Sequence, residues 1–280
     1  MRATRFVAGQ DIPVRAIGRG MLVLGAVLAA AGCASAPAPG AAAVPPAEAA
    51  PPRPASISAA DLGLYRSMDE ARAAPTEEEL KVVASSKKLL GQAPNAKVLV
   101  KGRQFTLDCI GTVCAIYYEL GIDVAKDFDK YPGNGVNRLY RTLEERKALH
   151  RDRYPRTGDV VIWDNTWDAN GDGDRTNDPR THAGVVLAVD EDGTIHYVHE
   201  NLYKGVVIET MNLLKPTVAL DESGKRLNSG MAIATASGGA KPDRWLAGDV
   251  FQAFGDLLGI KEDLKVSGGL GRAELRLAGP

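Results

Sequence analysis

Residues 108–121 read DCIGTVCAIYYELG, and the fold predicted for the whole chain follows from them. Apolar side chains recur through this stretch at the spacing of one helix face: Ile110, Val113, Cys114, Tyr117 and Leu120. Asp108 is a residue type that caps helix N-termini, and Gly121 is typical of the position just past a helix end. The pattern therefore predicts a helix whose first residue is Cys109.

Cys109 and Cys114 receive different interpretations on this helix. A thiol attacks only as the thiolate, and a helix N-terminus lowers a thiol pKa through its unpaired N–H groups and its dipole. Cys109 is therefore a candidate nucleophile, with burial as a small apolar residue as the alternative. Cys114 lies roughly 140° further around the helix, on the apolar face, and is predicted to be a core residue. On one helix the two cysteines lie too far apart for a disulfide.

The rest of the chain predicts helices first and strands afterwards. Helices are expected over 59–74, 76–90, 134–150 and 247–259, and a strand or extended segment over 97–105. Strands are expected over 159–163 and 205–213, with a β-hairpin over 182–201 that turns at DEDG, residues 190–193. This order indicates an α+β domain with an antiparallel sheet.

A nucleophilic thiol needs a base, and the chain has only four histidines. His150 closes a charged helix pattern and is expected to be solvated. The other three fall in the hairpin 182–201. A turn that pairs the first and last residues of DEDG sets His182 opposite Asn201 and His199 opposite Gly184.

Side chains alternate along a strand, so this register sorts the polar residues of the hairpin onto two faces. His182, His199 and Asn201 share one face, whereas His196 and Glu200 point to the other. A slip of one residue in register would reverse the assignment. The hairpin thus gathers two imidazoles and an amide on one surface.

The segments DCIGTV, TGDVVIW, HAGVVL and IHYVHEN, in this order, resemble the NlpC-type and CHAP-type cysteine hydrolases of the bacterial cell wall, a papain-like superfamily. VVASSKKLLGQ resembles their leading helix, and the resemblance covers about residues 80–201. It implies a papain-like α+β domain, with N-terminal helices packed on an antiparallel sheet. It also implies Cys109 as nucleophile, His182 as general base and His199 as the group that orients His182.

CHAP-type members carry a glutamate and an asparagine near this point, so Glu200 and Asn201 compete with His199 for the third role. Because Glu200 points to the opposite face from His182, it is the less favoured candidate for the third role. His199 and Asn201 share the face of His182, and the sequence does not decide between them. The sequence departs from the family at Ile110, where a small serine is usual, and at Thr112. A bulky Ile110 is expected to narrow the cleft or to reshape an oxyanion site whose first donor would be the Cys109 backbone N–H.

The N-terminal segment predicts export and lipid anchoring. Residues 1–32 read as a signal peptide, and LAAAGC resembles the lipobox of bacterial lipoproteins, which makes Cys33 the acylated residue. Residues 33–56 form a Pro/Ala-rich tether, and 57–280 form the hydrolase domain with a C-terminal extension. Ala34 after the cysteine favours the periplasmic face of the outer membrane.

DANGDGDRTND, residues 168–178, spaces oxygen ligands as calcium loops do. The candidate ligands are Asp168, Asn170, Asp172, the Asp174 carbonyl and, with altered geometry, Asp178. The alternative is an Asx-turn loop without an ion. A bound calcium ion would order the strand that carries His182 and would take no part in the chemistry, for which no cofactor is required.

The formal net charge is −1 and no long block of like charge occurs, which gives nucleic acid no electrostatic support as a partner. The sequence therefore predicts a monomeric, lipid-anchored thiol hydrolase that cleaves amide bonds in peptidoglycan. Two alternatives stay open: an inactive wall-binding scaffold on the same fold, and an amidase or acyltransferase with a substrate outside the wall.

Overall fold

The computed structural model describes residues 73–231 and 243–266. The predicted signal peptide, lipidated Cys33, tether and nearly all of the helix expected over 59–74 lie outside these residues. No helix of the described part is both long enough and apolar enough to span a bilayer.

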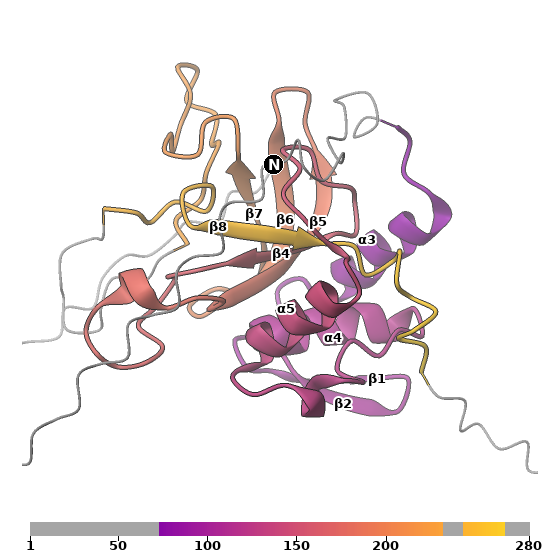
Figure 1. The fold of residues 1–280 in the computed structure, drawn as a ribbon. Helices are drawn as coiled ribbons and strands as arrows, with labels where there is room; N and C mark the ends of the chain where they lie inside the picture. Colours follow the sequence, from indigo (N-terminus) through magenta and orange to yellow (C-terminus); the bar gives the residue numbers. More distant parts are fainter. Residues whose placement is uncertain (1–72, 232–242, 267–280) are drawn as a thin grey trace, which may run out of the picture. The chain divides into compact units, whose positions relative to one another are not determined.

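Within residues 73–231 three α-helices precede the main sheet, and two of them match their predicted positions. Helix α3 covers Glu77–Leu89 and begins with a capping box, in which Thr76 and Glu79 cap each other's backbone N–H. Helix α4 covers Cys109–Glu119, as the opening stretch predicts. Helix α5 covers Gly135–Glu145 and ends before the predicted residue 150. All three lie on one side of the sheet, together with the β1–β2 hairpin (Figure 1).

The strands form a two-stranded and a six-stranded sheet, both antiparallel. The predicted extended segment is the small hairpin of β1 (Lys97–Val100) and β2 (Arg103–Thr106). The large sheet has the order β3-β8-β4-β5-β6-β7. Its strands are β3 (Leu149–His150), β4 (Val160–Trp163), β5 (His182–Val189), β6 (Thr194–Asn201), β7 (Gly205–Asn212) and β8 (Phe251–Gly255). The α+β prediction is confirmed.

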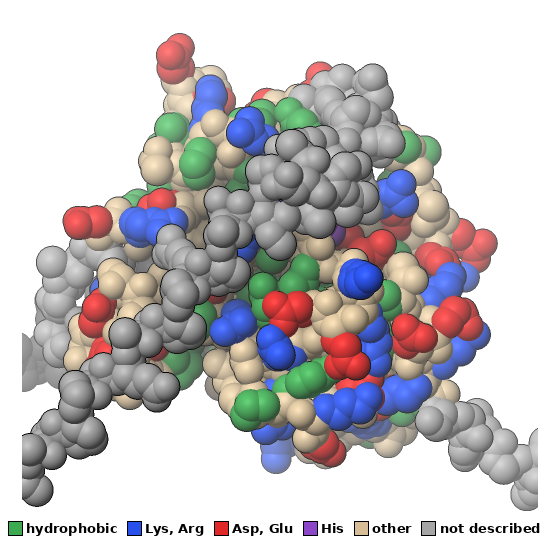
Figure 2. Space-filling model, viewed as in Figure 1, with side chains coloured by type: hydrophobic (Ala, Val, Ile, Leu, Met, Phe, Trp, Pro, Cys, Tyr) green, Lys and Arg blue, Asp and Glu red, His purple; other side chains and the backbone are tan. Residues whose placement is uncertain are grey.

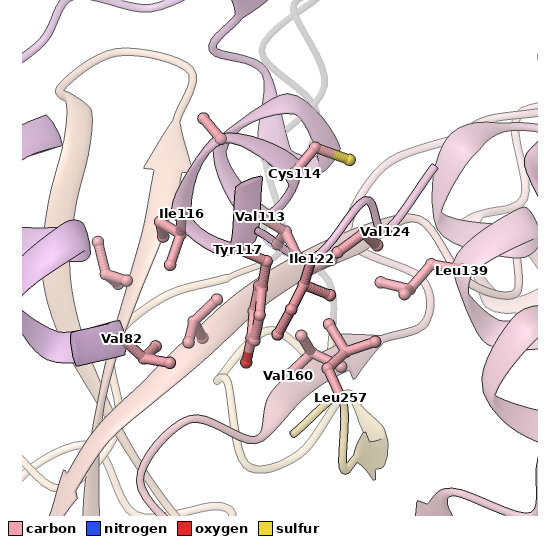
Figure 3. Close-up of a cluster of buried hydrophobic side chains, with 14 of the residues drawn as sticks. Val82, Val113, Cys114, Ile116, Tyr117, Ile122, Val124, Leu139, Val160 and Leu257 are labelled. Carbon is pink, nitrogen blue, oxygen red and sulfur yellow. The ribbon is translucent and has the colours of Figure 1, made fainter. Parts of the chain in front are cut away.

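The two faces of the large sheet carry separate cores. Residues Val160, Ala183, Val185 and Val198 face the helices and pack with side chains of α3, α4 and α5. The opposite face carries a second cluster, which includes Val161, Trp163, Val186, Tyr197 and Phe254. Figure 3 shows side chains of α4 meeting β4 within the first cluster. The buried Tyr117 hydroxyl donates a hydrogen bond to the carbonyl of Gly158, which ties α4 to the turn before β4.

One predicted helix is too long at its C-terminal end, and another is wrong throughout. The segment 134–150 leaves the helix at Lys147, which takes a positive φ of 53°, and continues as β3. The segment 247–259 contains no helix and supplies β8, which pairs with both β3 and β4. Its apolar residues at 250, 254, 257 and 258 imitate helical spacing, but the backbone hydrogen bonds offered by two neighbouring strands override that pattern.

The predicted hairpin register is wrong at the turn and right at the other end. Asp190 donates its N–H to the carbonyl of Thr194 (2.8 Å), so the turn is one residue longer than predicted. The longer turn shifts the β5–β6 register by one residue, and a bulge between Val186 and Ala188 reverses this shift. Val185 therefore pairs with Val198, as the predicted register requires. His182 and His199 therefore share a face, because the two departures cancel.

Gly205 begins β7 at a point where the chain passes close to the loop after α3. Its φ is +75°, and a Cβ added there would lie 1.9 Å from the carbonyl oxygen of Gln92. Gly224 has a similar φ of +84° with no atom near an added Cβ. The two glycines have the same backbone conformation, but only Gly205 lies close to another segment of backbone.

Gly224→Ala is expected to lower the free energy of unfolding by about 1 kcal/mol, the cost of a positive φ alone. Gly205→Ala is expected to cost roughly 3 kcal/mol or more, because the backbone of β7 and of the loop must also separate. Urea unfolding of both variants measures the difference, and equal losses would contradict the close approach.

Candidate active site

Cys109 lies at the first position of α4, as predicted. The Asp108 side chain caps the helix by accepting a hydrogen bond from the N–H of Gly111 (2.6 Å). Gly111 is required for this tight start, since an added Cβ would lie 1.8 Å from the carbonyl oxygen of Thr106. The cysteine is half-buried and unpaired, and Cys114 is buried in the helix-side core, as predicted.

The first residues of β5 have a described ladder partner on one side only. Strand β5 pairs with β4 as far as His182, but its described pairing with β6 starts at Val185. In antiparallel sheets an unpaired stretch leaves backbone N–H groups available to other acceptors. The backbone of Ala183 hydrogen bonds to the thiol of Cys109, which places the sulfur at the start of β5, beside the residue that follows His182.

The two histidines of the predicted face are in contact. Nε2 of His182 lies 2.8 Å from Nδ1 of His199. Nε2 of His199 lies 3.2 Å from a carboxylate oxygen of Glu209 on β7, whose other oxygen accepts a hydrogen bond from Nζ of Lys204 (2.8 Å). The arrangement is a relay from His182 through His199 to a carboxylate.

Aromatic rings hold the two imidazoles in place. The ring centroid of Trp163 lies 5.7 Å from that of His182, and the ring of Tyr197 lies 5.2 Å from that of His199. The Trp163 indole N–H donates to the carbonyl of Ala247 (2.9 Å), which fixes the indole. Gly184 leaves the space for this packing, because an added Cβ would lie 3.2 Å from the Cβ of His199.

The thiol pKa differs from the prediction. Burial and, to a lesser extent, the carboxylates of Asp108 and Glu200 together raise the pKa of Cys109 to about 12. Hydrogen bonds from the backbone of Ala183 and Ile110 act in the opposite direction but are weaker. The helix N-terminus alone predicted a lowered pKa, and this is wrong because desolvation outweighs the helix dipole. The resting cysteine is a thiol.

The imidazole of His182 is neutral. Burial and the proximity of His199 lower the pKa of His182 well below its ordinary value. Burial alone would raise the pKa of Glu209, but hydrogen bonds from His199 and Lys204 lower it below the ordinary value. A neutral base backed by an ionised carboxylate can accept a proton during a reaction and share the resulting positive charge.

The other proposed members of the site lie elsewhere. The Asn201 amide oxygen accepts hydrogen bonds from the N–H groups of Tyr203 (3.0 Å) and Lys204 (3.2 Å), so this side chain closes the β6–β7 turn. Glu200 is buried and interacts with Asp108 at the start of α4, on the opposite face from His199. The structure therefore brings His199, and neither competitor, to His182.

Sequence reasoning missed Glu209. The β6–β7 register pairs His199 with Val207, so Glu209 is the diagonal neighbour of His199 on the same face. The detectable signal was a single acid at an inward position of the strand GVVIETMNL. Extending the hairpin argument by one strand would have found it.

Ile110 does not have the position expected of it. It packs against the start of α5, where a Cβ added to Gly135 would lie 2.8 Å from its side chain. Ile110 and the glycine together set how closely α5 approaches the first turn of α4. The structure thus gives Ile110 a packing role.

His150 is buried, which contradicts the prediction of a solvated side chain. Its two ring nitrogens lie 3.3 Å and 3.2 Å from the carboxylates of Asp152 and Asp159. Burial opposes its protonation, but these two carboxylates raise the pKa of His150 to about 9. The buried cluster joins β3 to the start of β4 and lies apart from the relay.

The acidic loop uses its side chains to hold its own backbone. Asp168 accepts from the N–H groups of Gly171 (2.7 Å) and Gly173 (2.9 Å), and Asn170 accepts from Asp172 (2.9 Å). Across residues 73–231 and 243–266 no group of three or more His, Cys, Asp or Glu side chains is arranged to hold a metal ion. Carboxylate and amide oxygens, which this loop supplies, are the ligands that calcium prefers. One oxygen of the buried Asp178 carboxylate has no hydrogen bond in the described part of the chain.

Comparisons with known proteins found no match: no family model, no curated protein and no solved structure is significantly similar to the chain.

Glu209→Gln is expected to lower the free energy of unfolding by about 1–3 kcal/mol at pH 7, because a charged acceptor is lost from a buried pair. The pKa of Glu209 is lower in the folded state than in the unfolded state. The ionised carboxylate therefore stabilises the fold at a pH above its unfolded-state pKa, and this stabilisation is lost as the pH falls through its folded-state pKa. The stability difference from wild type should therefore shrink between pH 5 and about pH 3. The exposed Glu222→Gln is the matched control and should show no such trend; a difference independent of pH would contradict the relay.

Calcium binding by the loop 168–178 stays a prediction with a direct measurement. Millimolar calcium is expected to raise the melting temperature of the chelator-treated protein, since an ion bound only to the folded state stabilises it. Asp172→Asn should reduce that increase. An unchanged melting temperature and an unchanged activity after chelation would leave the loop without an ion.

Proposed function

We propose that the protein is a papain-like thiol hydrolase of the NlpC/CHAP type that cleaves amide bonds in peptidoglycan. The observation that supports this most strongly is the arrangement at the start of β5. There the Cys109 thiol, at a helix N-terminus, lies beside the strand residue that follows His182, and His182 is backed by His199 and Glu209.

The reaction would begin with proton transfer from the Cys109 thiol to Nδ1 of His182, since Nε2 is engaged with His199. The two side chains belong to opposite faces of the sheet at the start of β5, so this transfer requires the imidazole to turn toward the thiol or a water molecule to carry the proton. The sulfur would attack the carbonyl carbon of the amide as the proton leaves, and the backbone N–H of Cys109 at the helix start would stabilise the oxyanion. His182 would then protonate the leaving amine. Water, deprotonated by His182, would release the acyl group from the thioester.

His199 and Glu209 would act by positioning and by charge. His199 engages Nε2 of His182 and so leaves Nδ1 as the nitrogen available for proton transfer. The ionised Glu209 stabilises the positive charge that arises when His182 accepts the proton. A neutral thiol and a neutral imidazole in the resting state favour general-base activation during attack over a preformed ion pair.

The substrate class rests on the N-terminal sequence. A lipobox-like Cys33 and a tether with a reach of about 70 Å would hold the domain at the periplasmic face of the outer membrane, within reach of the wall. The protein would act as a monomer and would need no cofactor for the chemistry.

One observation favours the inactive wall-binding alternative: the pKa of Cys109 is about 12, far above that of an activated cysteine. Under that alternative sacculi would bind the protein without being cut. An amidase or acyltransferase acting outside the wall would instead process soluble acyl donors and leave sacculi intact.

Digestion of purified sacculi with analysis of the products by mass spectrometry tests the proposal. Cys109→Ala is expected to lower the rate by about 1,000-fold or more, since the nucleophile is removed. Cys114→Ala is the matched control: it removes a buried thiol from the same helix and should keep the activity at a stability cost of about 1 kcal/mol. Equal digestion by wild type and Cys109→Ala would rule out the mechanism.

A further inference from the structure

Arg180 is a half-buried cation that the proposed mechanism does not use. It lies two residues before His182, and its guanidinium carbon is 4.8 Å from the ring centroid of Tyr140 on α5. The guanidinium forms no ion pair with a carboxylate of residues 73–231 and 243–266, whereas Arg146 pairs with Asp127. A cation–π contact uses the face of the guanidinium and leaves the N–H groups at its edge free to donate.

The N–H groups at the end of the Arg180 side chain are accessible to a ligand. Arg180 and Tyr140 are both partly exposed. The three guanidinium nitrogens have no hydrogen-bond partner in the described part of the chain, and of these only Nε is shielded from solvent. The two terminal nitrogens therefore present their donors to solvent, in the planar fork that matches the two oxygens of a carboxylate.

The backbone of Arg180 is held on both sides. Its N–H donates to Oδ1 of Asp164, just after β4 (2.7 Å), and its carbonyl accepts from Nδ2 of Asn134 at the start of α5 (3.3 Å). Its φ is +57°, a left-handed conformation that costs free energy for a residue with a long side chain. Glycine or asparagine would suit this backbone better, so the reason for an arginine lies in its side chain.

Two contacts place Arg180 beside the nucleophile. The backbone of Ala183, three residues further along, hydrogen bonds to the Cys109 thiol, so at most about 11 Å of extended chain separates the two positions. The start of α5, which holds the Arg180 carbonyl, also packs against the residue after the cysteine. A Cβ added to Gly135 there would lie 2.8 Å from the side chain of Ile110.

We infer that Arg180 forms a subsite for a carboxylate of the substrate, a short distance from the bond that Cys109 attacks. The terminal N–H groups of the guanidinium would donate to the two carboxylate oxygens, while the ring of Tyr140 supports the guanidinium from its face. The inference rests on the proposed function and specifies its substrate: an amide within about three residues of a free carboxylate, as un-crosslinked peptidoglycan stem peptides provide.

The test compares un-crosslinked stem peptides with the same peptides after conversion of every carboxylate to its methyl amide. Binding is measured by calorimetry on Cys109→Ala, so that no cleavage occurs. The free-carboxylate peptides are expected to bind about 10-fold more tightly, the effect of a hydrogen bond between charged groups at a partly exposed site. With Arg180→Asn added, this ratio should fall to near one. Asparagine tolerates a positive φ, so the fold and the affinity for the blocked peptides should change little.

Arg141→Gln, introduced into the same Cys109→Ala background, is the matched control. Arg141 lies on α5, as Tyr140 does, but it is paired with Glu144, so its loss should preserve the ratio. A ratio near one in Cys109→Ala itself would overturn the subsite, as would a ratio that survives Arg180→Asn or falls equally with Arg141→Gln. Failure of the proposed function would show separately, as equal digestion of sacculi by wild type and Cys109→Ala.

Discussion

The hydrogen bond between Nε2 of His182 and Nδ1 of His199 is the contact on which the rest of the site depends. It requires β5 and β6 to place both imidazoles on one face, and it requires Gly184 to leave room for His199. It also fixes which nitrogen of His182 is free to meet a substrate or a thiol. The start of β5, where Ala183 has no described partner on β6, hydrogen bonds through its backbone to Cys109 of α4.

Burial sets the electrostatics of the site more than local dipoles do. Desolvation keeps Cys109 protonated and His182 neutral, even though the cysteine occupies a helix N-terminus. Glu209 stays ionised because Lys204 donates a hydrogen bond to it and the His199 ring nitrogen lies 3.2 Å from its other oxygen. The site is therefore neutral where bonds would be made and broken, and its permanent charges lie one step further out. Acidic and basic side chains are interspersed over the described part of the face seen in Figure 2.

Local patterns predicted the parts of this structure that local interactions determine. The start and end of α4 follow from a capping aspartate, an apolar helical stripe and a glycine, and α3 follows in the same way. The segment 247–259 could not be predicted, because its strand exists only through pairing with β3 and β4, which are about 100 residues away in the sequence. The same is true of Glu209, whose role depends on the register of a third strand. The face assignment of His182 and His199 was right although the turn was not, because the bulge at residue 187 restored the register.

The pH dependence of Cys109 alkylation, followed by mass spectrometry in the Cys114→Ala background, tests the central account most directly. A buried thiol with a pKa of about 12 predicts a slow rate at neutral pH that keeps rising to the highest pH at which the protein stays folded. A rate that reaches a plateau near pH 7 would show a preformed thiolate and would contradict the account of a neutral thiol and a neutral imidazole.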